Sequence, residues 1–467
     1  MTTPPSRLRY VPSAAARQRP ASVLRNRGFL VLFLIQLIAQ TAQNALLFGL
    51  LVVVTDLTKT STFTSVLVMS YVLPTFVAGV FSGVLVDLWS KRRLLILTNL
   101  VRAIATLGFL LSVDHVWGLI AINLVFATAG QFFNTANTVT IPFLVSREEL
   151  IAANSTYSMT VTVCQLAGMI VLSPVVLATL GPEALFILCL GLLLGASALA
   201  RLLPIVEHDD GHPERQLPTR EDFRRAAAEY WTALRSIRNE PTTNLALLHV
   251  TLASTLVLLF AVLVPRYMQA ILQISPDRAV SVFAPVAFGA LLGFRFLPRV
   301  ANRFGKVRTV AVGLAGLAVC LAAFGMVETI GDALRRTEHL NPFAEETAQR
   351  FGGLSILVAL TTALSGPLGF SFALVNAPAQ TILHEWAPAD MRGRVFAAQV
   401  VLANGVSILP LMVAGGVADL YGVSSVILGI AVIMASVAVL SVWVDLKYGI
   451  SERVERGRAG GQVARPG

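Results

Sequence analysis

The sequence has 467 residues, of which 55% are hydrophobic and only 13% charged, and its mean hydropathy is +0.73. A soluble protein of this length needs more charge on its surface than this composition supplies, so we expect the chain to lie in lipid. The net charge of +10 would suit nucleic acid, but Lys and Arg sit in short gaps between apolar runs, which excludes a phosphate-reading face.

Apolar runs of membrane-spanning length recur along the whole chain. Crossing a hydrocarbon core of about 30 Å takes about 20 mostly apolar residues per helix. Residues 1–27 carry six Arg and precede a run too long for a signal-peptide core, so we expect an uncleaved anchor. The runs predict an all-α polytopic membrane protein with twelve transmembrane helices, at 29–54, 62–86, 94–113, 116–144, 152–180, 184–203, 243–273, 279–297, 309–327, 353–382, 395–418 and 423–444.

The distribution of basic residues predicts the orientation of these helices. With the N-terminus inside, 29 Lys and Arg residues fall on the cytoplasmic side and 6 on the other, with Arg102 inside a span. Cytoplasmic loops carry such an excess in membrane proteins. We therefore expect a multi-pass protein of the plasma membrane with both termini in the cytoplasm.

The longest internal polar gap divides the spans six and six. We predict a basic N-terminal tail (1–27), a six-helix bundle (28–203), a cytoplasmic linker (204–241), a second bundle (242–446) and a C-terminal tail (447–467). Within the linker, the spacing of apolar residues after Thr219 predicts an amphipathic helix along the inner leaflet.

The loops after spans two and eight repeat one pattern. At an offset of 215 residues, Asp87 aligns with Asn302, Lys91 with Lys306 and Arg93 with Arg308. Two six-helix halves in the same orientation form a parallel repeat, and transporters bind substrate at the interface of such halves.

These residues carry a resemblance to a known family. Gly83-x-Leu-x-Asp87-x-x-Ser90-Lys-Arg-Arg resembles the signature loop of the major facilitator superfamily, with Ser90 in place of the usual glycine. Two further motifs resemble the branch of macrolide-efflux proteins and the enterobactin exporter: Pro142-x-Leu-Val-x-x-Glu-Glu-Leu-x-Ala-Ala-Asn154 and Trp386-Ala-Pro-x-x-Met-Arg-Gly-Arg394-Val-Phe. Over about residues 25–446, the resemblance implies the major facilitator fold, alternating access and no cofactor.

The loop after span two is the candidate gate. Gly83 lets another helix approach closely, and a carboxylate at Asp87 can face the positive N-terminal end of a neighbouring helix. The resemblance implies that this neighbour is span eleven, which begins near Arg394. Neutral Asn302 predicts a weaker latch in the second half. For Lys91, Arg92 and Arg93, a gating role stands beside a purely topological one, and Lys306 is a further candidate gating residue.

Polar stripes within spans are the candidate substrate site. Polar groups are costly in lipid, so they face the bundle interior. Interhelical hydrogen bonding explains any one of them equally well, but stripes on several spans favour a shared cavity. The predicted substrate-binding residues are Gln36, Gln40, Gln43 and Asn44 on span one, Gln131 and Asn134 on span four, and Asn376 and Gln380 on span ten.

The sequence gives little indication of which ion drives transport, because no acidic residue falls in the middle of a span. Proton coupling is implied by the resemblance alone, with Asp87, His249, Glu328, His384 and Glu385 as candidates. Span five departs from the Gly-Pro signature of antiporters, Gly168-Met169 and Ser173-Pro174 being its nearest matches. Arg102 either pairs inside the protein or meets an anionic substrate.

The sequence favours a monomeric transporter that exports a bulky, largely apolar small molecule, such as a drug or siderophore, by proton antiport. Its expected partners are this substrate, membrane lipid and protons, with no metal and no nucleic acid. No catalytic motif such as GxSxG, HExxH or a P-loop is present, so we expect no enzyme. Uptake of a nutrient or organic anion, and a non-transporting receptor or scaffold, are the alternatives.

Overall fold

The computed structural model describes residues 20–146, 149–204, 241–275, 279–336, 356–386 and 392–448. Every regular element within these ranges is a helix, which confirms the all-α prediction. The linker with its amphipathic helix and most of both tails lie outside the described residues.

The first half of the chain, here called the N-half, forms six spans. Asn26 caps the first, since its side-chain oxygen accepts hydrogen bonds from the backbone N–H of Gly28 (2.9 Å) and Phe29 (3.2 Å). At Gly181 the backbone φ is +84°, so the fifth span ends and the sixth begins there. The elements are η1 (Pro20–Arg25), α1 (Arg27–Thr58), α2 (Ser61–Leu88), α3 (Lys91–Leu111), α4 (Val116–Leu144), α5 (Leu150–Gln165), the π-helix η2 (Leu166–Leu172) and α6 (Ser173–Ala200).

The second half, here called the C-half, repeats this arrangement. It contains α8 (Pro241–Tyr267), the π-helix η3 (Met268–Leu272), α9 (Ala279–Phe304), α10 (Lys306–Gly325), α11 (Val327–Arg336), α13 (Ile356–Trp386), α14 (Arg392–Tyr421) and α15 (Val423–Tyr448). The short helices η1 and α11 have no counterpart in the sequence predictions, and the π-helices η2 and η3 lie inside the predicted spans 152–180 and 243–273. The predicted span 152–180 corresponds to α5, η2 and the part of α6 before Gly181, and the span 184–203 to the rest of α6. The other helices agree with the predicted spans to within a few residues, except α9, which extends seven residues beyond 297.

The outer surface of these helices suits lipid. Within the described ranges, nine helices are long and apolar enough to cross a membrane, and α9 adds a shorter apolar stretch at Ser281–Leu297. Large apolar side chains such as Ile104, Val319 and Val439 are exposed, which in water would be costly.

Helix packing confirms the internal repeat. In the N-half α2 packs on α4, α3 on α4 and α6, and α1 on α5; in the C-half α9 packs on α13, α10 on α13 and α15, and α8 on α14. The same pairs therefore recur in the same order, as a parallel repeat requires.

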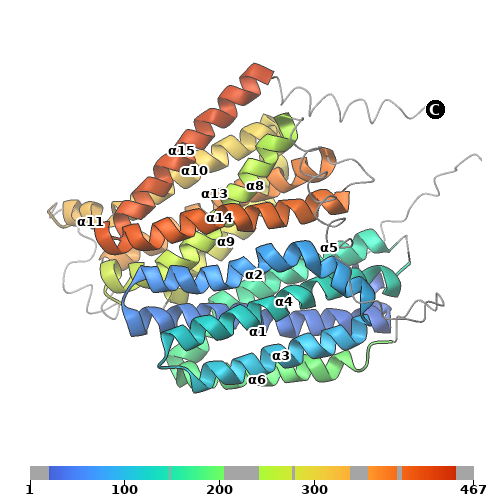
Figure 1. Ribbon diagram of the computed structural model, residues 1–467. Helices are drawn as coiled ribbons and strands as arrows, with labels where there is room; N and C mark the ends of the chain where they lie inside the picture. Colours follow the sequence, from blue (N-terminus) through green and yellow to red (C-terminus); the bar gives the residue numbers. More distant parts are fainter. Residues whose placement is uncertain are drawn as a thin grey trace, which may run out of the picture.

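The two halves meet along antiparallel helices. Figure 1 shows the N-half, in blue to green, beside the C-half, in yellow to red, with α2 next to α14. Helices α8 and α9 also reach the N-half, where α8 contacts both α1 and α2 and α9 contacts η2. We call the end of the bundle at the α1–α2 turn the Thr60 end, and the opposite end, at the α2–α3 turn, the Ser90 end.

Candidate functional site

The four amides predicted on span one form one buried stripe along α1. Gln36, Gln40, Gln43 and Asn44 are each less than a tenth exposed. The Asn137 amide of α4 donates to the side-chain oxygen of Gln36, and the Asn44 amide donates to the Gln40 carbonyl (2.8 Å). The stripe thus ties α1 to α4 inside the N-half, through Asn137, which the sequence predictions did not include.

Arg102 is fully buried in the middle of α3 and is paired within the protein. Its guanidinium donates to the Gln43 side-chain oxygen (2.9 Å), the Ala39 carbonyl (3.1 Å) and the Asn99 side-chain oxygen (3.3 Å). It also lies over the rings of Phe126 and Phe133, 5.0 and 5.1 Å from their centroids. Neutral acceptors and aromatic faces therefore hold this cation.

Gln43 also forms a hydrogen bond with α2. Its amide nitrogen donates to the Tyr71 hydroxyl at 2.6 Å. Gly130 of α4 lies against the same group, because a Cβ there would stand 3.2 Å from the Gln43 side-chain oxygen. Neither Tyr71 nor Gly130 was expected from the sequence.

The predicted amides of the other two spans remain partly exposed. Gln131 and Asn134 lie on α4, and Asn376 and Gln380 on α13, all half-buried. On α13 the Gln380 amide donates to the Asn376 side-chain oxygen (3.3 Å). As substrate-binding residues, these four amides and those of α1 stay predictions.

Among the residues that the structure describes, three hydrogen bonds from one carboxylate join the halves at the Thr60 end. The Asp419 carboxylate of α14 accepts hydrogen bonds from the backbone N–H of Ser61 (2.6 Å) and Thr62 (2.8 Å) and from the Thr62 hydroxyl (2.5 Å). It thereby caps α2 across the interface, where the helix dipole favours a negative charge. We call this contact the Asp419 clamp.

Two further contacts close the same end. The Gln269 amide of η3 donates to the Asp56 carboxylate of α1 at 2.7 Å. One turn below Asp419, Gly415 lets α14 approach α2, because a Cβ there would stand 2.2 Å from the Ser65 hydroxyl.

At the Ser90 end the structure describes part of the predicted gate. Gly83, Asp87, Asn302 and Arg394 lie in α2, α9 and α14, but their side chains are outside the described part of the chain. Lys91 begins α3, with its ammonium 5.8 Å from the Phe143 ring centroid, and Arg93 is exposed in the same turn. The gating roles of these residues stay predictions.

The repeated loop of the C-half includes a pairing that the sequence did not predict. Lys306 is buried at the start of α10, and the Arg308 guanidinium lies 3.6 Å from the carboxylate of Asp445 on α15. Asp445 is 6% exposed. Asp445, in the last turn of α15, therefore pairs with a basic residue of this loop. The only signal for this pairing in the sequence was an acidic residue near the end of span twelve.

Of the candidate proton carriers, the structure describes the contacts of His249 and the position of Glu328. His249 of α8 is buried, and its Nε2 shares a hydrogen bond with the Ser441 hydroxyl of α15 (2.7 Å), inside the C-half. Glu328 lies in the first turn of α11. The side chains of His384 and Glu385 are outside the described residues.

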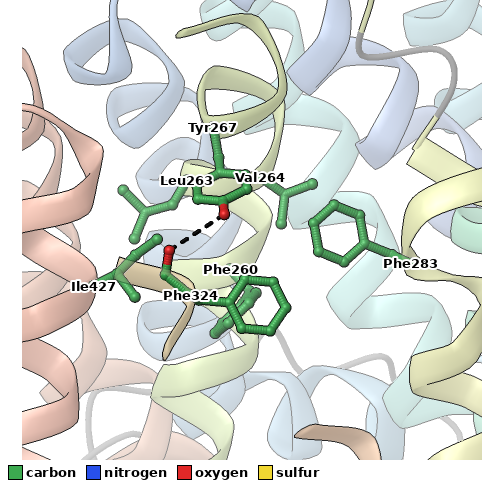
Figure 2. A pocket seen from close by; sticks show the side chains of 7 residues that line it. All are labelled: Phe260, Leu263, Val264, Tyr267, Phe283, Phe324 and Ile427. Atoms are coloured by element: carbon green, nitrogen blue, oxygen red, sulfur yellow. Dashed lines mark hydrogen bonds between the residues drawn. The ribbon is translucent and has the colours of Figure 1, made fainter. Parts of the chain in front are cut away.

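A small apolar pocket lies between α8, α9, α10 and α15 near the Thr60 end. Figure 2 shows its lining by Phe260, Leu263, Val264, Tyr267, Phe283, Phe324 and Ile427. The Tyr267 hydroxyl donates to the Phe324 carbonyl (3.3 Å), as the dashed line in Figure 2 marks. The pocket belongs to the packing of the C-half and faces none of the predicted site residues named above.

Comparisons with known proteins agree with this architecture. Residues 32–334 match the Major Facilitator Superfamily, which is more than half of the chain. No curated protein sequence matches the chain.

Solved structures share the fold at low sequence identity. The nucleoside transporter NupG (D323A mutant) is 14% identical with a TM-score of 0.65, over 90% of this chain and 100% of that one. An auto-inhibited POT family peptide transporter is 15% identical with a TM-score of 0.64, over 90% and 97%. A POT family transporter in complex with 5-aminolevulinic acid is 9% identical with a TM-score of 0.67, over 90% and 96%. The chain therefore belongs to the Major Facilitator Superfamily and is a secondary transporter, not an enzyme.

Proposed function

We propose that the protein exports a bulky, largely apolar small molecule by alternating access, in exchange for protons, as the resemblance to the macrolide-efflux and enterobactin-exporter branch implies. The half-buried amides of α4 and α13 support this substrate class. Amides between apolar helices suit a weakly charged compound better than a strongly ionic one.

The Asp419 clamp is the main observation that supports a mechanism of alternating access. It joins residues 357 and 358 positions apart in the sequence through hydrogen bonds and no covalent link. Its carboxylate is exposed, so the cost of separating the halves there is modest. A closed end held by such a contact can open when substrate binding favours the other state.

The orientation follows from the excess of Lys and Arg. This excess favours an orientation with the Ser90 end in the cytoplasm and the Thr60 end outside. In that orientation, the described conformation is closed on the outer side. An exporter needs this end closed while it binds substrate from the cytoplasm.

The test is transport in proteoliposomes. The purified protein is reconstituted with the Ser90 end outward and given erythromycin, enterobactin or tetraphenylphosphonium, with and without an acid interior. We expect uptake of at least one compound into the vesicles, at a rate that falls when the pH gradient is collapsed.

Three other results would contradict parts of this proposal. A transport rate that does not depend on the pH gradient would exclude proton antiport. Transport of nucleosides or peptides, but of none of the three bulky compounds, favours uptake of a nutrient. No transport of any compound by correctly folded protein favours the receptor or scaffold alternative.

A further inference from the structure

Tyr71 lies on the face of α2 that points into the protein. Successive residues of an α-helix are about 100° apart, which places Tyr71 about 160° from Leu73 and about 120° from Val77. Both of these are exposed on the outer surface, at 42% and 50%. The half-buried side chain of Tyr71 therefore has its accessible part on the inner side of α2.

The depth of Tyr71 is close to the middle of the membrane. It follows Ser61, the first residue of α2, by ten positions, or about 15 Å at 1.5 Å per residue. This is about half of a hydrocarbon core of ~30 Å. Its hydroxyl lies at the seam between α1 and α2, and α8 of the C-half contacts both of these helices.

The hydrogen bonds around Tyr71 have one possible direction. A guanidinium has only donors, so the Gln43 atom that meets Arg102 must be the amide oxygen. The Gln43 nitrogen then faces Tyr71 and donates to its hydroxyl oxygen. The Tyr71 proton finds no acceptor among the described side chains and carbonyls, so it is available to a bound molecule.

Tyr267 provides a contrast within the same protein. Its hydroxyl donates to the Phe324 carbonyl and lies 3.4 Å from the Thr361 hydroxyl, and the residue is 2% exposed (Figure 2). The proton of Tyr267 is thus used inside the C-half. The proton of Tyr71 has no acceptor among the described residues of the N-half.

The charge of Arg102 makes the Tyr71 hydroxyl a stronger hydrogen-bond donor. Within the described chain, the guanidinium bonds only to amide and carbonyl oxygens, so no carboxylate neutralises it there. A chain of hydrogen bonds that starts from a cation polarises each following donor. The far end of this chain, the Tyr71 hydroxyl, attracts an acceptor oxygen, and a carboxylate oxygen most strongly.

We propose that Tyr71 contacts substrate at the interface of the halves by donating to a carbonyl or carboxylate oxygen, and that Arg102 is a positioning residue acting through Gln43. This rests on the proposed function and narrows its substrate class: a bulky apolar molecule that carries a hydrogen-bond acceptor. Gln43 then acts on substrate through Tyr71.

The first experiment tests the position of Tyr71 without any substrate. Single cysteines replace Tyr71 or Leu73 in a variant whose three native cysteines are alanine, and a charged methanethiosulfonate reagent is added to the detergent-solubilised protein. We expect modification at position 71 to be at least about tenfold faster than at position 73. Equal rates, or no modification at 71 in folded protein, would overturn the proposal.

The second experiment tests the hydrogen bond with two probes. Erythromycin carries carbonyl oxygens, whereas tetraphenylphosphonium is bulky and apolar with no hydrogen-bonding group. We expect Tyr71→Phe to weaken erythromycin binding about tenfold and to leave tetraphenylphosphonium binding unchanged. Gln43→Leu and Arg102→Met should show the same selective loss, and Arg102→Lys should restore part of it.

Tyr267→Phe is the matched control, because it removes a hydroxyl whose proton is already used. We expect it to affect the two probes equally. Equal erythromycin affinity in Tyr71→Phe and the unaltered protein would refute the role of Tyr71. If the unaltered protein binds neither probe, the proposed export function fails, and the cysteine rates still decide whether Tyr71 faces the interface.

Discussion

Asp419 of α14 and Ser61 of α2 lie 358 positions apart in the sequence, yet the carboxylate of one accepts a hydrogen bond from the backbone N–H of the other at 2.6 Å. Ser61 is the first residue of α2, so the acid of the C-half satisfies an N–H group that a helix leaves unpaired at its start. The two halves share a helix cap, and the cap is lost when they separate.

Asp419→Asn should weaken closure of the Thr60 end. The amide keeps one acceptor oxygen but loses the second and the charge that favours a helix N-terminus. We expect the population open at this end to rise about fivefold. Distances between spin labels at Leu57 and Leu420, both exposed at this end, measure it. Asp114→Asn, an exposed acid at the α3–α4 turn, is the control and should change nothing.

Gly415→Ala should open the same end through sterics. The added Cβ would stand 2.2 Å from the Ser65 hydroxyl and 2.9 Å from the Ser61 carbonyl, so α14 must move away from α2. Gly416→Ala is a matched control on the next residue, where a Cβ meets nothing within 4 Å. The same spin-label pair serves here, and identical distance distributions in the two alanine variants would contradict the close approach at Gly415.

Hydropathy and charge bias predicted most of the fold, whereas the contacts between helices could not be predicted from the sequence. The stripe from Gln36 to Asn44 is a local pattern of period 3.6, so it could be placed on one face of α1. Its partners Asn137 and Tyr71 lie on other helices, and nothing local relates them to it. Asp419 likewise resembles any acid at a helix end, and its role depends on which helix start lies beside it.

His249 should have no part in proton coupling. Its imidazole bonds to Ser441 inside the C-half, away from the contacts between the halves. We expect His249→Asn to keep the pH profile of transport while lowering the melting temperature, because a buried hydrogen bond is disturbed. A shifted pH profile with an unchanged melting temperature would reverse this assignment.

Asp87 and Asp419 should act as opposing latches. Asp87 is the penultimate residue of α2 and Asp419 lies two residues before the end of α14, and these helices run antiparallel side by side. Each acid therefore sits at the level where the other helix begins. We expect Asp87→Asn to favour opening at the Ser90 end, opposite to Asp419→Asn, and the double variant to return close to the original balance, since the two effects subtract. Label pairs at both ends measure the three variants, with Asp114→Asn again as control. If the double variant had the same populations of open states as Asp419→Asn alone, Asp87 would have no influence on the equilibrium between them.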